Sequence, residues 1–142
     1  MTGSREDQRV MDLEAGRRRS KATVIVVVNL LVAGLHFVIR PDYRGPFPNF
    51  VNGYLIDLVL PLAVYILLCT QDRPPLGIWW VRALLVFGFG CFVEGAQYHG
   101  YPLFGTTFDP WDILMYGLGV TAGVLLDILV FPKVFTFWKP AP

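Results

Sequence analysis

The sequence predicts an all-α membrane protein with four transmembrane helices, and three observations support this fold class. Hydrophobic residues make up 54% of the 142-residue chain and charged residues only 16%, against about 25% charge in a typical soluble domain. Four apolar stretches are each close to the roughly 20 residues that a helix needs to cross the hydrocarbon core. These stretches are also too long for barrel strands, and they do not alternate apolar with polar residues.

The four predicted spans begin and end at charged or helix-breaking residues. Their ranges are 22–39, 50–70, 78–97 and 112–131. Lys21 and Arg40 flank the first span, and Pro132 ends the last. Pro74 and Pro75 separate the second span from the third, because neither proline can continue a helix.

The distribution of basic residues predicts the orientation. With four spans, ten of the twelve Lys and Arg residues fall on the side of the two termini, and only Arg40 and Arg44 fall on the other side. Because cytoplasmic loops carry the excess of Lys and Arg, we expect the N- and C-termini to be cytoplasmic. The expected organisation is a polar cytoplasmic N-terminal tail (1–21), a four-helix transmembrane domain (22–131) and a short cytoplasmic C-terminal tail (132–142).

The N-terminal tail leads directly into the first span, as the charged region of a signal peptide does. No small-residue cleavage site follows the apolar run, so we expect the span to be a retained anchor. The tail alternates acidic and basic residues, and in isolation we expect it to be disordered or to form a short surface helix.

Ionisable side chains in the spans are the candidate functional residues, because they are costly in lipid and usually face the interior of a bundle. In the predicted orientation they gather in the outer half of the bundle, apart from Asp127 near the cytoplasmic end. The candidates for ligand binding are Glu94, Gln97, Asp109, Asp112, Asp57 and Tyr116. The same side chains could instead bond to one another and fix the helix register, and the sequence leaves both roles open.

Two glycines continue the stripe of Asp112 and Tyr116 along the last span. Gly119 and Gly123 are four residues apart, a spacing that permits close approach of a neighbouring helix. We therefore expect them to serve helix packing.

Catalytic and cofactor signals are weak. No nucleophile motif or phosphate-binding glycine loop is present, so catalytic residues are unknown and an enzyme is the less favoured interpretation. No metal site is predicted, because the spacing of His36 and His99 matches no metal-binding motif. His36 is expected to be a hydrogen-bonded core histidine, with axial ligation of a haem or a chlorophyll-type pigment as a minor alternative. No other cofactor is predicted, although a bound lipid would fit the polar pocket.

Four tryptophans stand near the predicted ends of the spans. They are Trp79, Trp80, Trp111 and Trp138. Tryptophans are enriched at membrane–water interfaces, so we expect all four to belong to an interfacial belt.

One pattern in the second half of the chain resembles the VanZ-like family of small bacterial integral membrane proteins. The matching residues are Glu94, Gln97, Asp109, Asp112, Gly119 and Gly123, with Asp57 at an acidic position often seen in the second helix. The family pattern has Glu-x-x-Gln late in one helix, then a loop and Arg-x-x-Asp-x-x-Asp-x-x-x-Asn-x-x-Gly-x-x-x-Gly. Here Thr106 stands at the arginine position and Tyr116 at the asparagine position.

The resemblance implies a multi-pass protein of the bacterial cytoplasmic (inner) membrane whose outer-face polar pocket binds a lipid headgroup or a cell-envelope precursor. The family's namesake is linked to glycopeptide resistance. The alternative is a non-catalytic accessory subunit of a larger membrane complex, either energy-transducing or containing a pigment or haem. The expected partners are membrane lipids and other membrane protein subunits, without nucleic acid.

Overall fold

The computed structural model describes residues 3–39, 43–103 and 108–138, and its regular structure in these ranges is entirely helical. The elements are α1 (Gly3–Gly34), η1 (Leu35–Ile39), α2 (Pro48–Gly53), α3 (Leu55–Leu68), α4 (Trp79–Tyr98), α5 (Pro110–Leu125), η3 (Leu126–Val130) and α6 (Phe131–Val134). η1 and η3 are single π-helical turns that continue α1 and α5. The prediction of an all-α protein is therefore confirmed for the described residues.

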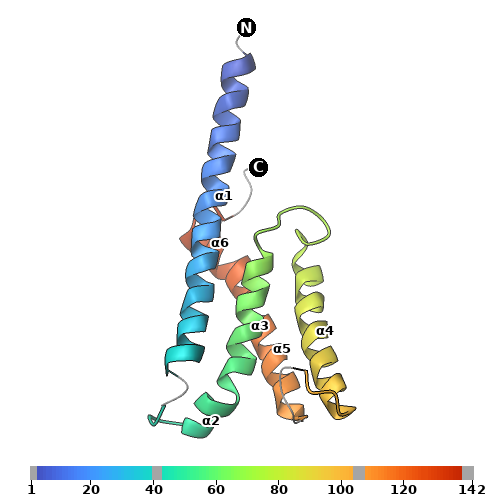
Figure 1. Cartoon of the computed structure of the whole chain (residues 1–142). Helices are drawn as coiled ribbons and strands as arrows, with labels where there is room; N and C mark the ends of the chain where they lie inside the picture. Colours follow the sequence, from blue (N-terminus) through green and yellow to red (C-terminus); the bar gives the residue numbers. More distant parts are fainter. Residues whose placement is uncertain (1–2, 40–42, 104–107, 139–142) are drawn as a thin grey trace.

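Three segments are long and apolar enough to cross a membrane. They are Arg5–Val38, Trp79–Tyr98 and Pro110–Val134. The fourth apolar helix, α3, has 14 residues and is about 21 Å long, shorter than the roughly 30 Å hydrocarbon core. The helices α1, α3, α4 and α5 run alternately in opposite directions (Figure 1).

The short helix α3 occupies the centre of the bundle and contacts α1, α4 and α5. Its closest neighbour is α5, because glycines on α5 face it. A Cβ atom added to Gly119 would collide with the carbonyl oxygen of Leu58, and one added to Gly123 would lie 3.0 Å from the Tyr65 ring. Absence of side chains at these two positions therefore lets the two helix backbones approach each other.

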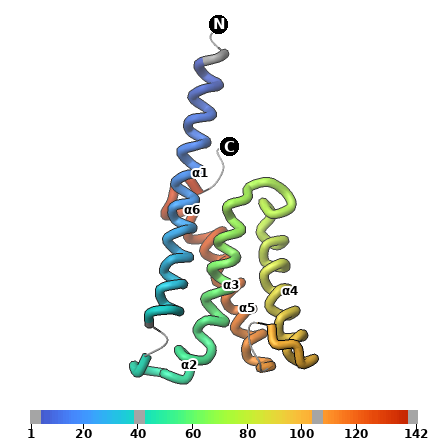
Figure 2. The backbone as a smooth tube through the Cα atoms, viewed as in Figure 1, coloured from blue at the N-terminus to red at the C-terminus, as the bar shows by residue number. Residues whose placement is uncertain are grey.

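The N-terminal tail is helical and continuous with the first span, since α1 begins at Gly3. The disordered tail or separate surface helix expected from the sequence is not what the structure shows. Every residue from 5 to 16 is exposed, and this part of α1 projects beyond the rest of the bundle (Figures 1 and 2). Contacts of Arg17 and Lys21 with Asp72 hold the helix against the bundle at the base of this projection.

Candidate functional site

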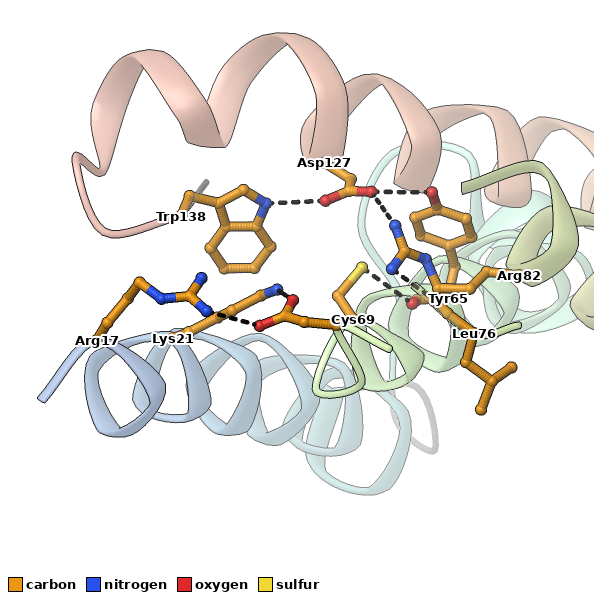
Figure 3. Close-up of polar contacts among 9 residues, drawn as sticks. Arg17, Lys21, Tyr65, Cys69, Leu76, Arg82, Asp127 and Trp138 are labelled. Atoms are coloured by element: carbon orange, nitrogen blue, oxygen red, sulfur yellow. Dashed lines mark hydrogen bonds and ion pairs between the residues drawn. The ribbon is translucent and has the colours of Figure 1, made fainter. Parts of the chain in front are cut away.

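Polar side chains form two clusters near opposite ends of the bundle. We call the first the acidic cluster; it lies where the start of α3 and of α5 meet the end of α4 (Figure 1). Its members are Tyr54, Asp57, Glu94, Asp109, Asp112 and Tyr116. We call the second the ion-pair cluster; it lies near the loop between α3 and α4 (Figure 3). Its members are Arg17, Lys21, Tyr65, Asp72, Arg82, Asp127 and Trp138.

Glu94 is the buried centre of the acidic cluster, with 1% of its surface exposed. Its Oε1 atom accepts a hydrogen bond of 3.1 Å from the Tyr116 hydroxyl, and its Oε2 atom accepts one of 3.3 Å from the Asp109 backbone N–H. These two bonds tie α4 to the first two turns of α5. A buried carboxylate needs such donors, because an unsatisfied one would be strongly destabilising.

Asp109 both starts α5 and joins it to the α2–α3 junction. Its Oδ1 atom accepts a hydrogen bond of 3.0 Å from the Trp111 N–H, which is the standard role of an aspartate at a helix N-cap. Its Oδ2 atom accepts a 3.1 Å bond from the Tyr54 hydroxyl. The backbone of α5 therefore begins at a position fixed relative to α3.

Asp112 lies in the first turn of α5 and is half-buried. The charges of Asp57, Glu94 and Asp109 all act on its carboxylate. Among the described residues, no side chain forms an ion pair with Asp112, and its carboxylate accepts no hydrogen bond. Within the described residues, Asp112 is therefore the member of the acidic cluster that has hydrogen-bond acceptors to spare.

Gln97 does not join the acidic cluster. Its side-chain amide donates a 2.9 Å hydrogen bond to the carbonyl oxygen of Leu103, so it supports the loop that follows α4. Thr106, at the arginine position of the VanZ-like pattern, lies outside the described residues.

Asp127 is the centre of the ion-pair cluster and accepts three hydrogen bonds (Figure 3). The donors are the Arg82 guanidinium at 2.6 Å, the Tyr65 hydroxyl at 3.0 Å and the Trp138 indole N–H at 2.8 Å. Arg82 also donates to the Leu76 carbonyl and lies over the Tyr65 ring. The pairing of Arg82 with Asp127 was not predicted from the sequence, although both are charged residues within apolar stretches and so required partners.

The prediction that all four tryptophans belong to an interfacial belt is wrong for Trp138. Its side chain is 3% exposed and packs edge-on against Phe131 with ring centroids 4.5 Å apart. Trp79, Trp80 and Trp111 are each about half exposed or more. A C-terminal tryptophan near a buried carboxylate has an indole N–H to satisfy that carboxylate, and this contact outweighs the interfacial preference.

Asp72 connects the loop after α3 to the N-terminal helix. It lies 2.5 Å from the Lys21 ammonium and 3.1 Å from the Arg17 guanidinium, and Lys21 also lies over the Trp138 ring. Burial alone would raise the pKa of Asp72, but the hydrogen bond and charge of Lys21, together with those of Arg17, lower that pKa below its ordinary value.

His36 lies in the π-helical turn η1, beside a small cavity. The cavity is partly open, has a volume of about 10 Å³, and has apolar walls that come from Leu35, Val51, Leu55, Ile56 and Val59 in addition to His36. The Nδ1 atom is buried and has no hydrogen-bond partner within the described ranges.

No group of three or more His, Cys, Asp or Glu side chains in the described ranges is arranged to hold a metal ion. Comparisons with protein families, curated proteins and solved structures found no match to the chain. The likeness to the VanZ-like family therefore rests on the matching residues alone.

Proposed function

We propose that this chain is a four-span protein of the bacterial cytoplasmic membrane whose acidic cluster binds a lipid headgroup or a cell-envelope precursor through a positively charged amine. The proposal is one of binding, and it assigns no catalytic residue. The resemblance to the VanZ-like family supports the bacterial membrane and the class of ligand. The geometry of the acidic cluster supports the amine.

The arrangement of the helices supports four spans with both termini in the cytoplasm. α3 is shorter than the hydrocarbon core, but its central position means that neighbouring helices, rather than lipid, cover most of it. The ion-pair cluster and the basic residues 17–19 lie at the end that carries both termini (Figure 1). By the positive-inside rule this end is cytoplasmic, and the acidic cluster then faces the outer leaflet.

The half-buried carboxylate of Asp112, which has no ion-pair or hydrogen-bond partner among the described residues, is the observation that carries the ligand proposal. At the other end of the bundle, Asp72 and Asp127 are each paired with a cation. The negative charges of three further carboxylates act on Asp112, and it has no such partner among the described residues. Ionisable groups in a membrane bundle are retained where they serve a pathway or a ligand. An ammonium group would supply the missing charge and donors, and the rings of Tyr54 and Tyr116 would also favour a cation.

The test compares an amine-bearing lipid with one that lacks the amine. Purified protein in detergent is heated with added phosphatidylethanolamine or with added phosphatidylglycerol, and the unfolding midpoint Tm is measured. A ligand that binds only the folded state raises its stability, so we expect a larger gain with phosphatidylethanolamine. The Asp112→Asn substitution should remove this difference, because the amide carries no charge.

Asp7→Asn is the matched control, since it removes the same charge from an exposed position on α1. This variant should keep the full response to phosphatidylethanolamine. If each lipid raises the Tm of the wild type and of Asp112→Asn by the same amount, the carboxylates only fix the helix register and the ligand proposal is wrong.

The projecting N-terminal part of α1 favours a second candidate function, a non-catalytic subunit of a larger membrane complex. Residues 5–16 are exposed on all sides, which suits a segment that contacts another protein. Co-purification from native membranes with a stoichiometric set of other subunits would support this candidate. An absorption spectrum of the same preparation would show whether a haem or pigment accompanies His36.

A further inference from the structure

Exposed basic side chains surround the bundle at the level of the ion-pair cluster. They come from three segments, which are α1, the loop between α3 and α4, and α6 (Figure 1). Two contacts hold these segments at one level, because the Lys21 ammonium lies 2.5 Å from Asp72 in the loop and 5.1 Å from the centre of the Trp138 ring after α6. We call these exposed side chains the basic belt, whose members are Arg18, Arg19, Arg73 and Lys133.

The positive charge of the basic belt is left over after the nearby aspartates are paired. Both aspartates at this level already belong to ion pairs of the ion-pair cluster. Arg18 makes one exposed contact, 3.8 Å from Glu14. Within the described ranges, Arg19, Arg73 and Lys133 form no ion pair. The belt therefore presents positive charge to its surroundings.

The basic belt lies at the depth of lipid headgroups. The first apolar run begins directly after Lys21, and at 1.5 Å per residue Arg18 and Arg19 lie about 3 to 5 Å beyond that position along α1. The headgroup region extends roughly 5 to 8 Å on each side of the hydrocarbon core. Trp79 and Trp80, at the start of α4, are 49% and 50% exposed. Tryptophans are enriched at this interface, so they agree with the depth of the belt.

The charge of α1 changes sign at the edge of the basic belt. Residues 5–16 contain four acidic and two basic side chains, whereas residues 17–21 contain four basic side chains and no acidic one. An anionic membrane surface attracts the second segment and repels the first. This agrees with a helix that passes the headgroups and then projects beyond the bundle (Figure 2). A soluble polyanion would also meet the acidic segment, so an anionic lipid fits the belt better.

We propose that the basic belt binds the phosphate groups of phospholipids with a net negative charge, such as phosphatidylglycerol, in the leaflet on the side of the two termini. Each arginine of the belt has a guanidinium that can donate two parallel hydrogen bonds to one phosphate. A basic residue near an anionic surface favours binding by a factor of about five. The proposal does not depend on the acidic cluster, which lies at the other end of the bundle.

The test measures lipid selectivity by fluorescence quenching in vesicles. The full-length protein is reconstituted in phosphatidylcholine that contains a rising fraction of brominated phosphatidylglycerol or, in a parallel series, of brominated phosphatidylcholine. Bromine on a lipid quenches the tryptophans that the lipid contacts, and the exposed Trp79 and Trp80 follow the loop that carries Arg73. We expect brominated phosphatidylglycerol to quench at a lower fraction than brominated phosphatidylcholine.

Two double variants show whether the belt causes this preference. Arg19→Gln, Arg73→Gln should lower the preference for phosphatidylglycerol by at least about fivefold, because it removes two charges from the belt. Arg5→Gln, Arg9→Gln is the matched control, since it removes the same net charge from exposed positions beyond the headgroups. The control should keep the wild-type preference. All four arginines are exposed, so the fold should remain unchanged in both variants.

Salt provides a second measurement on the wild type. At about 0.5 M salt, charges are screened beyond about 4 Å, so the preference for phosphatidylglycerol should be lost. The partly buried acidic cluster is screened less, so the thermal comparison of phosphatidylethanolamine with phosphatidylglycerol at this salt concentration reports on that cluster alone.

Three results would overturn the assignment of the belt to anionic lipid. One is equal quenching of the wild type by the two brominated lipids at low salt. Another is an equal loss of preference in the two double variants, which would mean that net charge and not the belt selects the lipid. The third is a preference that stays unchanged at high salt.

Discussion

The Nη2 atom of Arg82 lies 2.6 Å from the Oδ2 atom of Asp127, and the two side chains are only 6% and 10% exposed. This pair joins the start of α4 to η3, the turn that follows α5. Separating a buried pair leaves one uncompensated charge, which is far more destabilising than the pair itself is stabilising. The pair is therefore a point where one substitution should affect the whole bundle.

The Asp127→Asn substitution should lower the stability of the protein by about 3 to 5 kcal/mol, because it leaves the Arg82 guanidinium buried without a counter-charge. Tyr65 and Trp138 donate to different oxygens of Asp127, so the single asparagine oxygen keeps one of these bonds and the loss combines the other bond with the ion pair. Thermal or denaturant unfolding in detergent measures the change. Trp138 fluorescence reports it locally, since the indole contacts the substituted residue.

Removing the charge of Arg82 as well tests why Asp127→Asn loses stability. In the double variant Arg82→Met, Asp127→Asn no buried charge remains in the pair. Neighbouring substitutions that share an interaction are not additive, so the double variant should be less destabilised than the two single losses summed. Simple additivity would mean that the ion pair does not couple α4 to η3.

The stability supplied by Asp72 should depend on pH. Its pKa is lowered in the folded protein, so the stabilisation is present above the unfolded pKa of about 3.9 and is lost as the pH falls through the folded pKa. At pH 7, Asp72→Asn should cost about 1 to 3 kcal/mol, because it leaves the buried Lys21 ammonium without its partner. The difference between wild type and variant should shrink as the pH falls below about 4.

Unfolding midpoints measured from pH 7 to pH 3 check this dependence. The exposed Asp7 again offers the control, since Asp7→Asn should follow the wild-type curve throughout. A stability difference between wild type and Asp72→Asn that stays constant across this range would contradict the assigned role of the ion pair.

Close packing of α3 and α5 predicts opposite effects for two glycines of one helix. An added Cβ at Gly119 collides with the backbone carbonyl of Leu58, whereas one at Gly117 meets the Phe87 ring at an ordinary 3.5 Å. Gly119→Ala should therefore cost about 1 to 3 kcal/mol through overpacking. Gly117→Ala should be neutral or stabilising by up to about 1 kcal/mol, because alanine is the better helix former. Unfolding of the two variants in one detergent gives the comparison, and equal losses would argue against the close approach at Gly119.

Apolar composition was enough to predict the helical class and four spans, three of which are helices long and apolar enough to cross a membrane, because length and hydropathy alone define a candidate span. Composition could not predict that the polar N-terminal tail continues α1 as one helix. The contact that fixes the base of this helix comes from Asp72, some fifty residues away, which pairs with Arg17 and Lys21. Tertiary contacts of this kind leave no periodic signal in the tail itself.

The residues of the acidic cluster could be named from the sequence, since carboxylates in apolar stretches are conspicuous. Their partners could not be named. Tyr54 donates to Asp109 across 55 positions of the chain, and Gln97 turns toward Leu103 although it is three residues from Glu94 on the same helix. Helix periodicity predicts the side of a helix on which a residue lies, but side-chain rotamers and the following loop decide what it contacts.

The hydroxyl of Tyr116 should stabilise the protein through its bond to Glu94, and removing it separates hydrogen bonding from packing in the acidic cluster. Tyr116→Phe keeps the ring that packs against Gly90 but removes the hydroxyl that donates to Glu94. A buried carboxylate that loses one of its two donors should destabilise the fold by about 1 to 3 kcal/mol. Tyr98→Phe is the matched control, because Tyr98 is 70% exposed and its variant should unfold like the wild type.

Adding Glu94→Gln to Tyr116→Phe removes the charge that needed the donor, so the double variant should lose less stability than the two single variants together. Equal losses for Tyr116→Phe and Tyr98→Phe would mean that the hydroxyl contributes nothing and that only the ring of Tyr116 holds α4 against α5.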